Sequence, residues 1–267
     1  MTRSLLLSLV LGLALSSCKG LFQYSPNEIR LEEEEKNLNV RNIQKINAQP
    51  VKDSFRFIVV GDSQRFYDQL DDFVSAVNRM RDISFVLLNG DISDFGLNRE
   101  FQLVNRSMSR LNVPYIAVVG NHDMLANGRL VYHQMFGAEN FSFTHHNSKF
   151  ICMNSNSLER GYDGTLPDMD WLASELSGGT EQRNIFVFSH IPPFDSGFDQ
   201  NMVQSYAAKL SQNGKVRLSI HGHTHKYSFS APYGEDVKYL VAGSVGNRSF
   251  ALVTVNNDQY KVEEVAY

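Results

Sequence analysis

The sequence predicts an α/β fold with mixed sheets, and two patterns along the chain indicate it. From Val51 onward, short apolar runs rich in β-branched residues alternate with segments whose apolar residues recur at helical spacing. After His225 only short alternating runs follow, as in antiparallel strands. The chain has 267 residues and is 42% hydrophobic, which is enough to bury a sizeable core. It contains no internal repeat or low-complexity segment, so we expect one folded domain.

Several predicted strands end in a cluster of polar residues. The runs and the clusters that follow them are Phe55–Val60 before Gly61–Gln64, Phe85–Asn89 before Gly90–Asp94, Tyr115–Val119 before Gly120–Asp123, Ile185–Phe188 before Ser189–His190, and Val216–Ile220 before His221–His225. The glycines allow the backbone to turn sharply where a strand leaves its sheet. Because open α/β sheets bind ligands at the carboxyl ends of their strands, we expect the clusters to meet at one edge of the core.

Helices and a hairpin are predicted between these runs. The stretch Tyr67–Arg81 carries apolar residues at the spacing of a helix face that packs on a core. Further helices are predicted at 98–111, 125–136, 168–176 and 200–210, a hairpin at 141–145 and 149–153, and late strands at 227–230, 237–242, 250–255 and 259–265. His145 and His146 lie beside the hairpin turn, where we expect a solvated turn and no third metal site. We expect His221 to be structural or to support a ligand. Asp94 is placed to cap the next helix or to fix a ligand through a hydrogen bond, and we favour the structural role.

The polar clusters have the composition of a metal site without thiolate ligands. The candidate ligands are Asp62, Gln64, Asp91, Asn121, His190, His223 and His225. Carboxylate, amide and imidazole donors suit Mn²⁺, Fe, Zn²⁺, Ni²⁺ or Mg²⁺. One tetrahedral site cannot use all of them, so the sequence predicts two divalent metal ions close together.

The order of the motifs resembles the calcineurin-like metallophosphoesterase family. Gly-Asp-x-x, Gly-Asp-x-x-Asp, Gly-Asn-His-Asp, a single His and Gly-His-x-His follow one another, and Leu166–Leu172 and Tyr239–Ser244 resemble a helix and a late strand of the family. The likeness covers residues 55 to 245. It implies a four-layer α/β/β/α sandwich and a dinuclear metal-dependent hydrolase of phosphate esters. In such an enzyme a water shared by the metals attacks the phosphorus.

The resemblance also assigns roles to the ligands. It implies that Asp91 bridges the metals, that Asp62 and His225 bind the first metal, and that the second metal is held by Asn121, His190 and His223. Gln64 stands where most of the family has a histidine. An amide oxygen binds first-row metals more weakly than imidazole does, so this position favours Mn²⁺.

The resemblance implies roles for two residues that are not ligands. His122 is matched to the active-site histidine of the family, which protonates the leaving oxygen or stabilises charge on the phosphoryl group. Asp123 is expected to orient the His122 ring through its other nitrogen. Asn154 and Asn156 end a strand near the same edge, so we expect them to line the substrate pocket. Arg65 follows the first cluster, where it is expected to meet the substrate phosphate.

The sequence leaves the exact reaction open. A phosphomonoesterase and a phosphodiesterase or nucleotide diphosphatase fit the motifs equally, and a non-catalytic metal-binding lipoprotein is the alternative from another class. Each of the two enzymes would act on a small phosphorylated substrate. The net charge of −4 argues against a nucleic-acid surface, and we expect a monomer.

The first residues have the features of an export signal. Leu5–Leu15 is apolar but too short to span a membrane comfortably, and Leu15-Ser16-Ser17-Cys18 resembles a bacterial lipobox. We therefore expect a signal peptide at 1–17, a lipid on Cys18, and a polar tether at 18–50 before the domain at 51–267. This organisation predicts a protein of the bacterial cell envelope that is anchored to the membrane by lipid, on the periplasmic side or at the cell surface.

Overall fold

The computed structural model describes residues 25, 27–50, 52, 54–178 and 181–267. Within these ranges the chain forms a five-stranded sheet in the order β11-β10-β1-β2-β3 and a six-stranded sheet in the order β4-β5-β6-β7-β9-β8. The first sheet contains β1 (Ser54–Val60), β2 (Ile83–Asn89), β3 (Tyr115–Val118), β10 (Ser249–Asn256) and β11 (Gln259–Ala266). The second contains β4 (Phe141–His145), β5 (Ser148–Cys152), β6 (Asn184–Phe188), β7 (Val216–His221), β8 (Ser228–Ser230) and β9 (Lys238–Val241).

Both sheets mix parallel and antiparallel pairs. Strands β1, β2 and β3 run parallel, and β10 and β11 add to β1 as an antiparallel ribbon. In the second sheet β5, β6, β7 and β9 run parallel, with β4 and β8 antiparallel at the edges. The predicted strands and the mixed sheets are confirmed.

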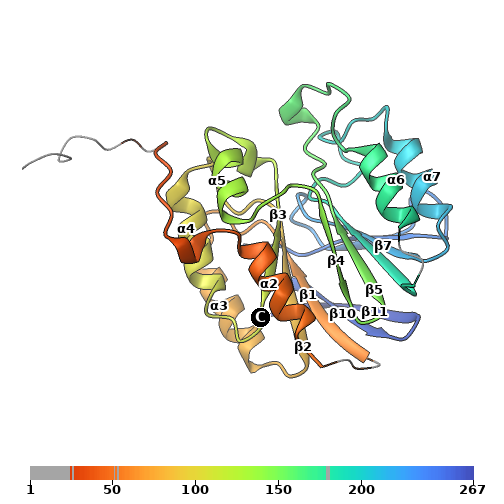
Figure 1. Cartoon of the computed structure of the whole chain (residues 1–267), viewed down its shortest axis with the longest axis horizontal. Helices are drawn as coiled ribbons and strands as arrows, with labels where there is room; N and C mark the ends of the chain where they lie inside the picture. The colour runs from red at the N-terminus through yellow and green to blue at the C-terminus, as the bar shows by residue number, and fades with distance from the viewer. Residues whose placement is uncertain (1–24, 26, 51, 53, 179–180) are drawn as a thin grey trace, which may run out of the picture.

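Helices cover the outer face of each sheet, which gives four layers (Figure 1). On one side lie α3 (Tyr67–Arg79), α4 (Asn98–Met108) and α5 (Gly128–Met135), and on the other lie α6 (Met169–Ser177) and α7 (Val203–Ser211). Helix α6 begins where predicted, because the Asp168 side chain accepts a hydrogen bond from the backbone N–H of Trp171. Helix α5 begins later than predicted, after the short helix η2 (His122–Met124).

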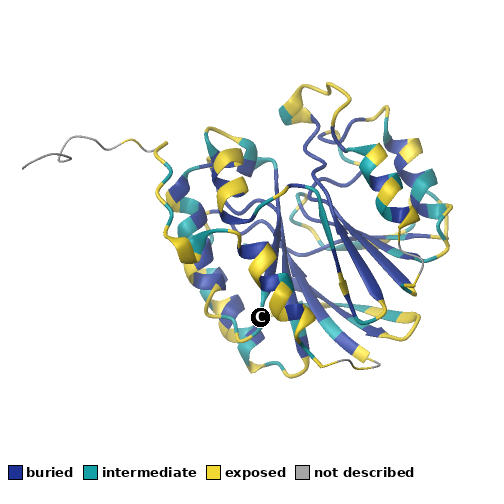
Figure 2. Cartoon of the chain, viewed as in Figure 1, coloured by how far each residue is buried: buried dark blue, intermediate teal, exposed yellow. Residues whose placement is uncertain are grey.

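Three apolar clusters hold the layers together, and the buried residues of Figure 2 follow them. Along β1, Ile58 and Val60 face α3 and α4, whereas Phe57 and Val59 face the second sheet. Between the sheets, Phe57 stacks on Phe85 with ring centroids 5.3 Å apart. Each parallel strand is thus buried on both faces, which explains its nearly continuous apolar sequence.

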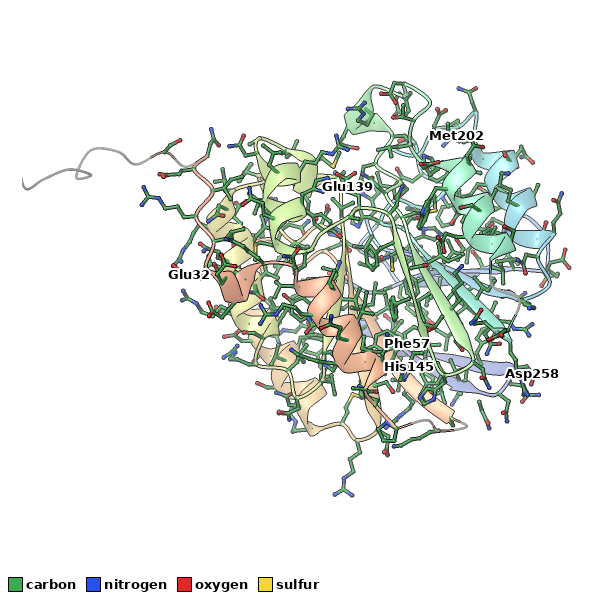
Figure 3. All side chains as sticks on the ribbon, viewed as in Figure 1. Glu32, Phe57, Glu139, His145, Met202 and Asp258 are labelled. Atoms are coloured by element: carbon green, nitrogen blue, oxygen red, sulfur yellow. The ribbon has the colours of Figure 1, made fainter. Side chains whose placement is uncertain are left out.

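The prediction of a solvated turn at His145 is wrong. His145 is only 4% exposed, and its ring makes a T-shaped contact with Phe55, with centroids 4.9 Å apart. Figure 3 labels His145 among the side chains of the fold. Burial, and then the neighbouring His146, lower the pKa of His145 to about 4. The imidazole therefore packs here as a neutral aromatic ring.

The predicted tether is also wrong at its carboxyl end, because the folded domain begins before residue 51. Helix α2 (Leu38–Asn47) lies along β3, the edge strand of the first sheet. The Asn39 side chain donates to the carbonyl of Ala117 and accepts from its N–H, both at 2.9 Å, and Asn42 donates to the carbonyl of Tyr115 at 2.8 Å. These amides satisfy edge groups that would otherwise need water or another strand.

No helix within the described ranges is long and apolar enough to cross a membrane. Cys18, the predicted lipidation residue, and the predicted signal peptide lie outside those ranges. Cys152 is a free cysteine, buried in β5.

Candidate active site

The polar clusters of both sheets meet at the carboxyl ends of their strands. Asp62 follows β1, Asp91 follows β2, and Asn121 follows β3 closely. From the second sheet, His190 follows β6, and the His223 and His225 pair follows β7. The prediction that these clusters lie together is confirmed by contacts between Asp91 and His190 and between Asp62 and His225.

The loops that carry the clusters have unusual backbone conformations. Asp62, Asp91, His223 and His225 have φ angles of 56°, 53°, 70° and 57°. Such angles are uncommon for residues other than glycine, although Asp and His tolerate them better than most. Backbone of this kind is held in place by its surroundings and concentrates at functional sites.

Two glycines allow the loops to approach each other. Gly90 has a φ of 88°, and a Cβ on it would lie 2.3 Å from the Nδ1 of His190. A Cβ on Gly120 would lie 2.1 Å from the backbone nitrogen of Asp91. A side chain at Gly90 would displace His190, and one at Gly120 would displace Asp91, so the close packing of the site requires both glycines.

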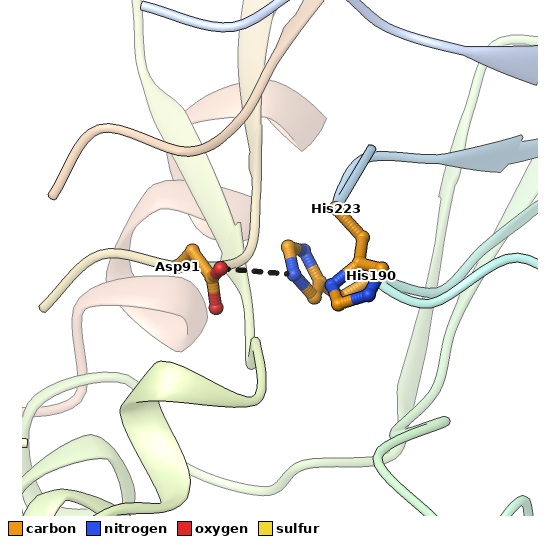
Figure 4. A group of neighbouring side chains, drawn as sticks. All are labelled: Asp91, His190 and His223. Atoms are coloured by element: carbon orange, nitrogen blue, oxygen red, sulfur yellow. Dashed lines mark ion pairs between the residues drawn. The ribbon is translucent and has the colours of Figure 1, made fainter. Parts of the chain in front are cut away.

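Two groups of side chains share Asp91. One comprises Asp62, Asp91 and His225, and the other comprises Asp91, His190 and His223. Within each group, one candidate ligand atom per residue lies within 4.8 Å of the others. The Oδ2 of Asp91 lies 3.2 Å from the Nε2 of His190, and His223 approaches the same place from β7 (Figure 4).

The charges of the site favour bound cations. Burial alone would lower the pKa of His190, yet the carboxylates of Asp91 and Asp62 raise it to about 10. The buried carboxylates thus stabilise a positive charge at His190. A divalent ion held by its Nε2 would supply that charge in place of a proton. Among the described residues, both Asp62 carboxylate oxygens, the Gln64 Oε1 and the His190 Nε2 are buried without a hydrogen-bond partner. Such donors fit two divalent metals.

The two amide residues lie beside these groups. The Oδ1 of Asn121 is 3.0 Å from the Nδ1 of His223, so the two atoms can bind one ion. Gln64 is 3% exposed and donates through Nε2 to the Oδ2 of Asp91 over 3.4 Å. A half-turn of its amide presents Oε1 to the same region, because the two ends have nearly the same shape.

His122 lies beside the Asp91 carboxylate and outside both groups. Its backbone N–H donates to the Oδ1 of Asp91 at 3.0 Å. Its Nδ1 lies 2.8 Å from the carbonyl oxygen of Asp94, which can only accept, so Nδ1 carries the proton and Nε2 is left for another partner. The Asp94 carboxylate also forms an ion pair with Arg65. Asp94 therefore does not cap a helix; it connects His122 with Arg65.

The prediction that Asp123 orients the His122 ring is wrong. The fully buried Asp123 carboxylate accepts from the backbone N–H groups of Ile92, Ser93 and Gly120 at 2.8–3.2 Å, and from the Ser93 hydroxyl at 2.9 Å. Asp123 thus fixes the loop that carries Asp91 against the loop that carries Asn121. Of these two consecutive residues, His122 faces the site, whereas Asp123 faces the protein interior.

A family comparison agrees with this geometry. Residues 55–227 match the model of the calcineurin-like phosphoesterase family, and this range is more than half of the chain. The chain belongs to the calcineurin-like phosphoesterase family. It is therefore a metallophosphoesterase, and its Asp and His groups occupy the edge at which two metals are typical of the family.

Curated relatives of this metallophosphoesterase are phosphodiesterases by name. It is 26% identical over 159 residues to a probable glycerophosphodiester phosphodiesterase of Arcobacter nitrofigilis, covering 54% of this chain and 57% of the relative. It is 23% identical over 183 residues to a 3',5'-cyclic-nucleotide phosphodiesterase of Nostoc, covering 63% and 68%. The chain thus spans little more than half the length of the first relative.

Solved structures share the fold. A dimetal phosphatase from Danio rerio matches with a TM-score of 0.66 and 17% identity, over 82% of this chain and 97% of that one. A purple acid phosphatase from yellow lupin matches with a TM-score of 0.63 and 13% identity, over 81% and 52%. The predicted four-layer sandwich is confirmed by these matches and by the sheet order.

The three residues expected around the substrate of this metallophosphoesterase differ in what their side chains contact. Asn154 is fully buried and donates to Glu139 at 2.9 Å while accepting from the backbone of Asn156, so its amide is used inside the protein. Asn156 is buried too and donates to the carbonyl of Val119 at 3.3 Å. Arg65 is exposed and forms an ion pair with Asp94, whose carboxylate also lies 3.7 Å from the Nδ1 of His122.

Sequence reasoning missed Asp195. Its Oδ1 lies 3.4 Å from the Nε2 of His223, although the two residues come from different loops. The local sequence shows only a turn, in which Asp195 accepts from the N–H of Gly197 at 2.8 Å. No periodicity or motif marks such a contact between distant loops.

Proposed function

We propose that this protein hydrolyses phosphodiesters with two divalent metal ions, of which Mn²⁺ is favoured. The single observation that supports this most is the sharing of Asp91 between two groups of ligands. When bound, the ions supply Lewis acidity and a nucleophilic water of lowered pKa. Asp62, Gln64, Asp91 and His225 would hold the first ion, and Asp91, Asn121, His190 and His223 the second.

In this proposal His122 acts on the leaving group. Its Nδ1 proton is committed to the Asp94 carbonyl, so in the imidazolium form of the ring the Nε2 proton is the one that would pass to the departing oxygen, which leaves the neutral ring. Arg65, paired with Asp94 next to this ring, would bind a phosphoryl oxygen that the metals do not contact. Asp123 keeps the loops of Asp91 and Asn121 in register and takes no part in proton transfer.

Charge favours a diester over a monoester. Near neutral pH a diester carries one negative charge, whereas a monoester carries close to two. Glu159, in η3 (Leu158–Arg160), has a buried carboxylate oxygen without a hydrogen-bond partner among the described residues, and its pKa is raised by burial and then by the charge of Asp91. A carboxylate in this position disfavours further negative charge nearby.

Apolar side chains on the same loops support an organic group on the phosphate. Phe95 and Leu125 are exposed beyond Asp94 and η2, and Leu158, Tyr162 and Phe194 are exposed on two loops that contact each other. Exposed apolar residues next to a polar site are typical of surfaces that bind the apolar part of a ligand. They would contact the alcohol portions of a diester.

Hydrolysis of two chromogenic esters by the purified full chain tests the proposal. We expect bis-nitrophenyl phosphate to be cleaved faster than nitrophenyl phosphate when Mn²⁺ is added. Cleavage of the monoester alone would favour the phosphomonoesterase. Binding of two metal ions with no cleavage of either ester would favour a non-catalytic metal-binding lipoprotein. Failure to bind two ions would refute the dinuclear site.

The proposal extends to the cellular location. A lipid on Cys18 would anchor the protein, as a monomer, in the bacterial cell envelope, on the periplasmic side or at the cell surface. The residues between Cys18 and η1 (Glu33–Glu35) would serve as a tether shorter than the sequence predicted. Labelled fatty acid should be incorporated by the wild type and not by Cys18→Ala, and an unlabelled wild type would refute the anchor.

A further inference from the structure

The loop between β6 and α7 brings a carboxylate to the outer side of the metal-ligand group. Asp195 on this loop places Oδ1 3.4 Å from the Nε2 of His223. The loop is held by the one that carries η3: the Tyr162 hydroxyl donates to the carbonyl of Ser196 at 2.7 Å, and the Leu158 N–H donates to the carbonyl of Gly197 at 3.2 Å. The two residues that follow Asp195 are thus tied to the η3 loop.

The two nitrogens of His223 face different partners. Nδ1 lies 3.0 Å from the Oδ1 of Asn121, and Nε2 faces Asp195. An amide oxygen and an imidazole nitrogen side by side are two donors for one ion, so Nδ1 is the nitrogen that faces the metal. Nε2 then carries the proton and can donate it to a carboxylate.

His190 shows the same arrangement with its nitrogens exchanged. Its Nδ1 lies 2.8 Å from the carbonyl oxygen of Asn89, and its Nε2 faces Asp91. Each histidine of this group therefore has one nitrogen toward the shared site and one held by an oxygen. For His190 the oxygen is a neutral backbone carbonyl, whereas for His223 it is a carboxylate.

We propose that Asp195 is a positioning residue that fixes His223 as an Nδ1 ligand of the second metal. The inference rests on the dinuclear site of the proposed function. A carboxylate that accepts from the outer nitrogen orients the ring, selects its tautomer and makes the inner nitrogen a better donor.

Asp195 acts through His223 and is not itself a ligand. The ligand atoms that lie within 4.8 Å of one another belong to Asp91, His190 and His223. The Asp195 carboxylate meets the far side of that imidazole, and its Oδ1 also accepts from the Gly197 N–H at 2.8 Å. Removing the carboxylate should therefore weaken the second metal without abolishing its site.

Titration of Mn²⁺ into metal-free full-length protein measures this effect. We expect Asp195→Ala to weaken the second binding step by roughly 10–100-fold and to leave the first step unchanged. Asp195→Asn should lose less, because its amide oxygen still accepts from Nε2. Asp163→Ala is the matched control, since it removes a carboxylate of the neighbouring η3 loop that pairs with Arg160 and Thr165 and not with His223. Its metal affinities should equal those of the wild type.

Nitrogen NMR of the zinc-loaded protein, which is diamagnetic, tests the tautomer directly. We expect the His223 signals to show Nδ1 bound to metal and a slowly exchanging Nε2 proton, and the proton to exchange fast in Asp195→Ala. Metal on Nε2 would overturn the inference, as would wild-type affinities in Asp195→Ala or equal losses in Asp163→Ala. These outcomes concern the inference alone, and the proposed function stands if the wild type still binds two ions and cleaves ester. A wild type that binds fewer than two ions refutes the proposed function itself.

Discussion

The two ligand groups that share Asp91 differ in how firmly the protein holds them. In the second group the His190 side chain is fully buried, its outer nitrogen is bound by the Asn89 carbonyl, and His223 meets Asp195. In the first group Asp62 is fully buried, but the His225 side chain is 43% exposed and Gln64 offers only an amide. Metal affinity depends on how well the surrounding protein orients the ligands, so the groups should not bind equally.

The two groups therefore differ in what orders their ligands. The second group is preorganised before an ion arrives, because its histidines cannot rotate without losing hydrogen bonds. The first group depends more on the ion itself to order His225 and the amide of Gln64. We therefore infer that the second metal is retained and the first exchanges with the solution. Variants that change one group at a time test this difference between the two groups.

Asp91→Asn should have the largest effect, because it changes both groups at once. A neutral amide cannot compensate the charge of two cations, and metal catalysis contributes several kcal/mol. We expect activity to fall by roughly 10³-fold or more and metal content to fall below two ions per chain. Metal analysis of the purified variant and ester hydrolysis check this. Full turnover with two bound ions would mean that the groups do not share Asp91.

His122→Ala tests the part of the site that belongs to neither group. Its ring is held by the Asp94 carbonyl, so its removal should leave both sets of ligands in place. We expect both metals to remain and turnover to fall by roughly 10²–10⁴-fold, as for a lost general acid. Asp123→Asn is the informative companion: it should disturb the Asp91 loop and lower metal content as well. Loss of metal in His122→Ala would show that His122 is a ligand.

A matched pair, His190→Ala and His225→Ala, separates the two groups. Each removes one imidazole, but His190 is also the ring against which Gly90 packs. We expect each variant to bind the ion of its altered group at least 10–100-fold more weakly than the wild type does, and to bind the other ion as the wild type does. The ion left in His225→Ala should survive dialysis against a chelator, whereas the ion left in His190→Ala should be lost. The reverse order would invert the comparison between the groups.

The comparison also shows how far the sequence could be read. The strands and the residues that follow them could be predicted, because a buried run and the polar cluster at its end are local features. Helix α2 could not, since it buries Asn39 and Asn42 against the edge of β3, and buried amides look like solvated residues in a sequence. The contacts of Asp195 and Asp94 are made between loops that only the fold brings together.

The smallest expected effect concerns Gln64, where the first group departs from the commonest pattern of the family. An imidazole in its place would add a strong nitrogen donor beside Asp62, Asp91 and His225, and imidazole suits Zn²⁺, Fe and Ni²⁺ better than an oxygen-rich site does. We therefore expect Gln64→His to tighten the first metal by about 10-fold and to reduce the need for added Mn²⁺, while the second metal is unchanged. Activity and calorimetric titrations of Mn²⁺ into both proteins measure this.

A second substitution, Gln64→Glu, distinguishes a metal ligand from a hydrogen-bond donor, because the Gln64 amide donates to Asp91 through Nε2 in the structure. A carboxylate would bind the first metal more tightly if Gln64 is a ligand, but it would repel Asp91 and weaken both metals if Gln64 is a donor. If wild-type protein keeps both ions through dialysis, or if Gln64→His binds no tighter, the first group is not the weaker one.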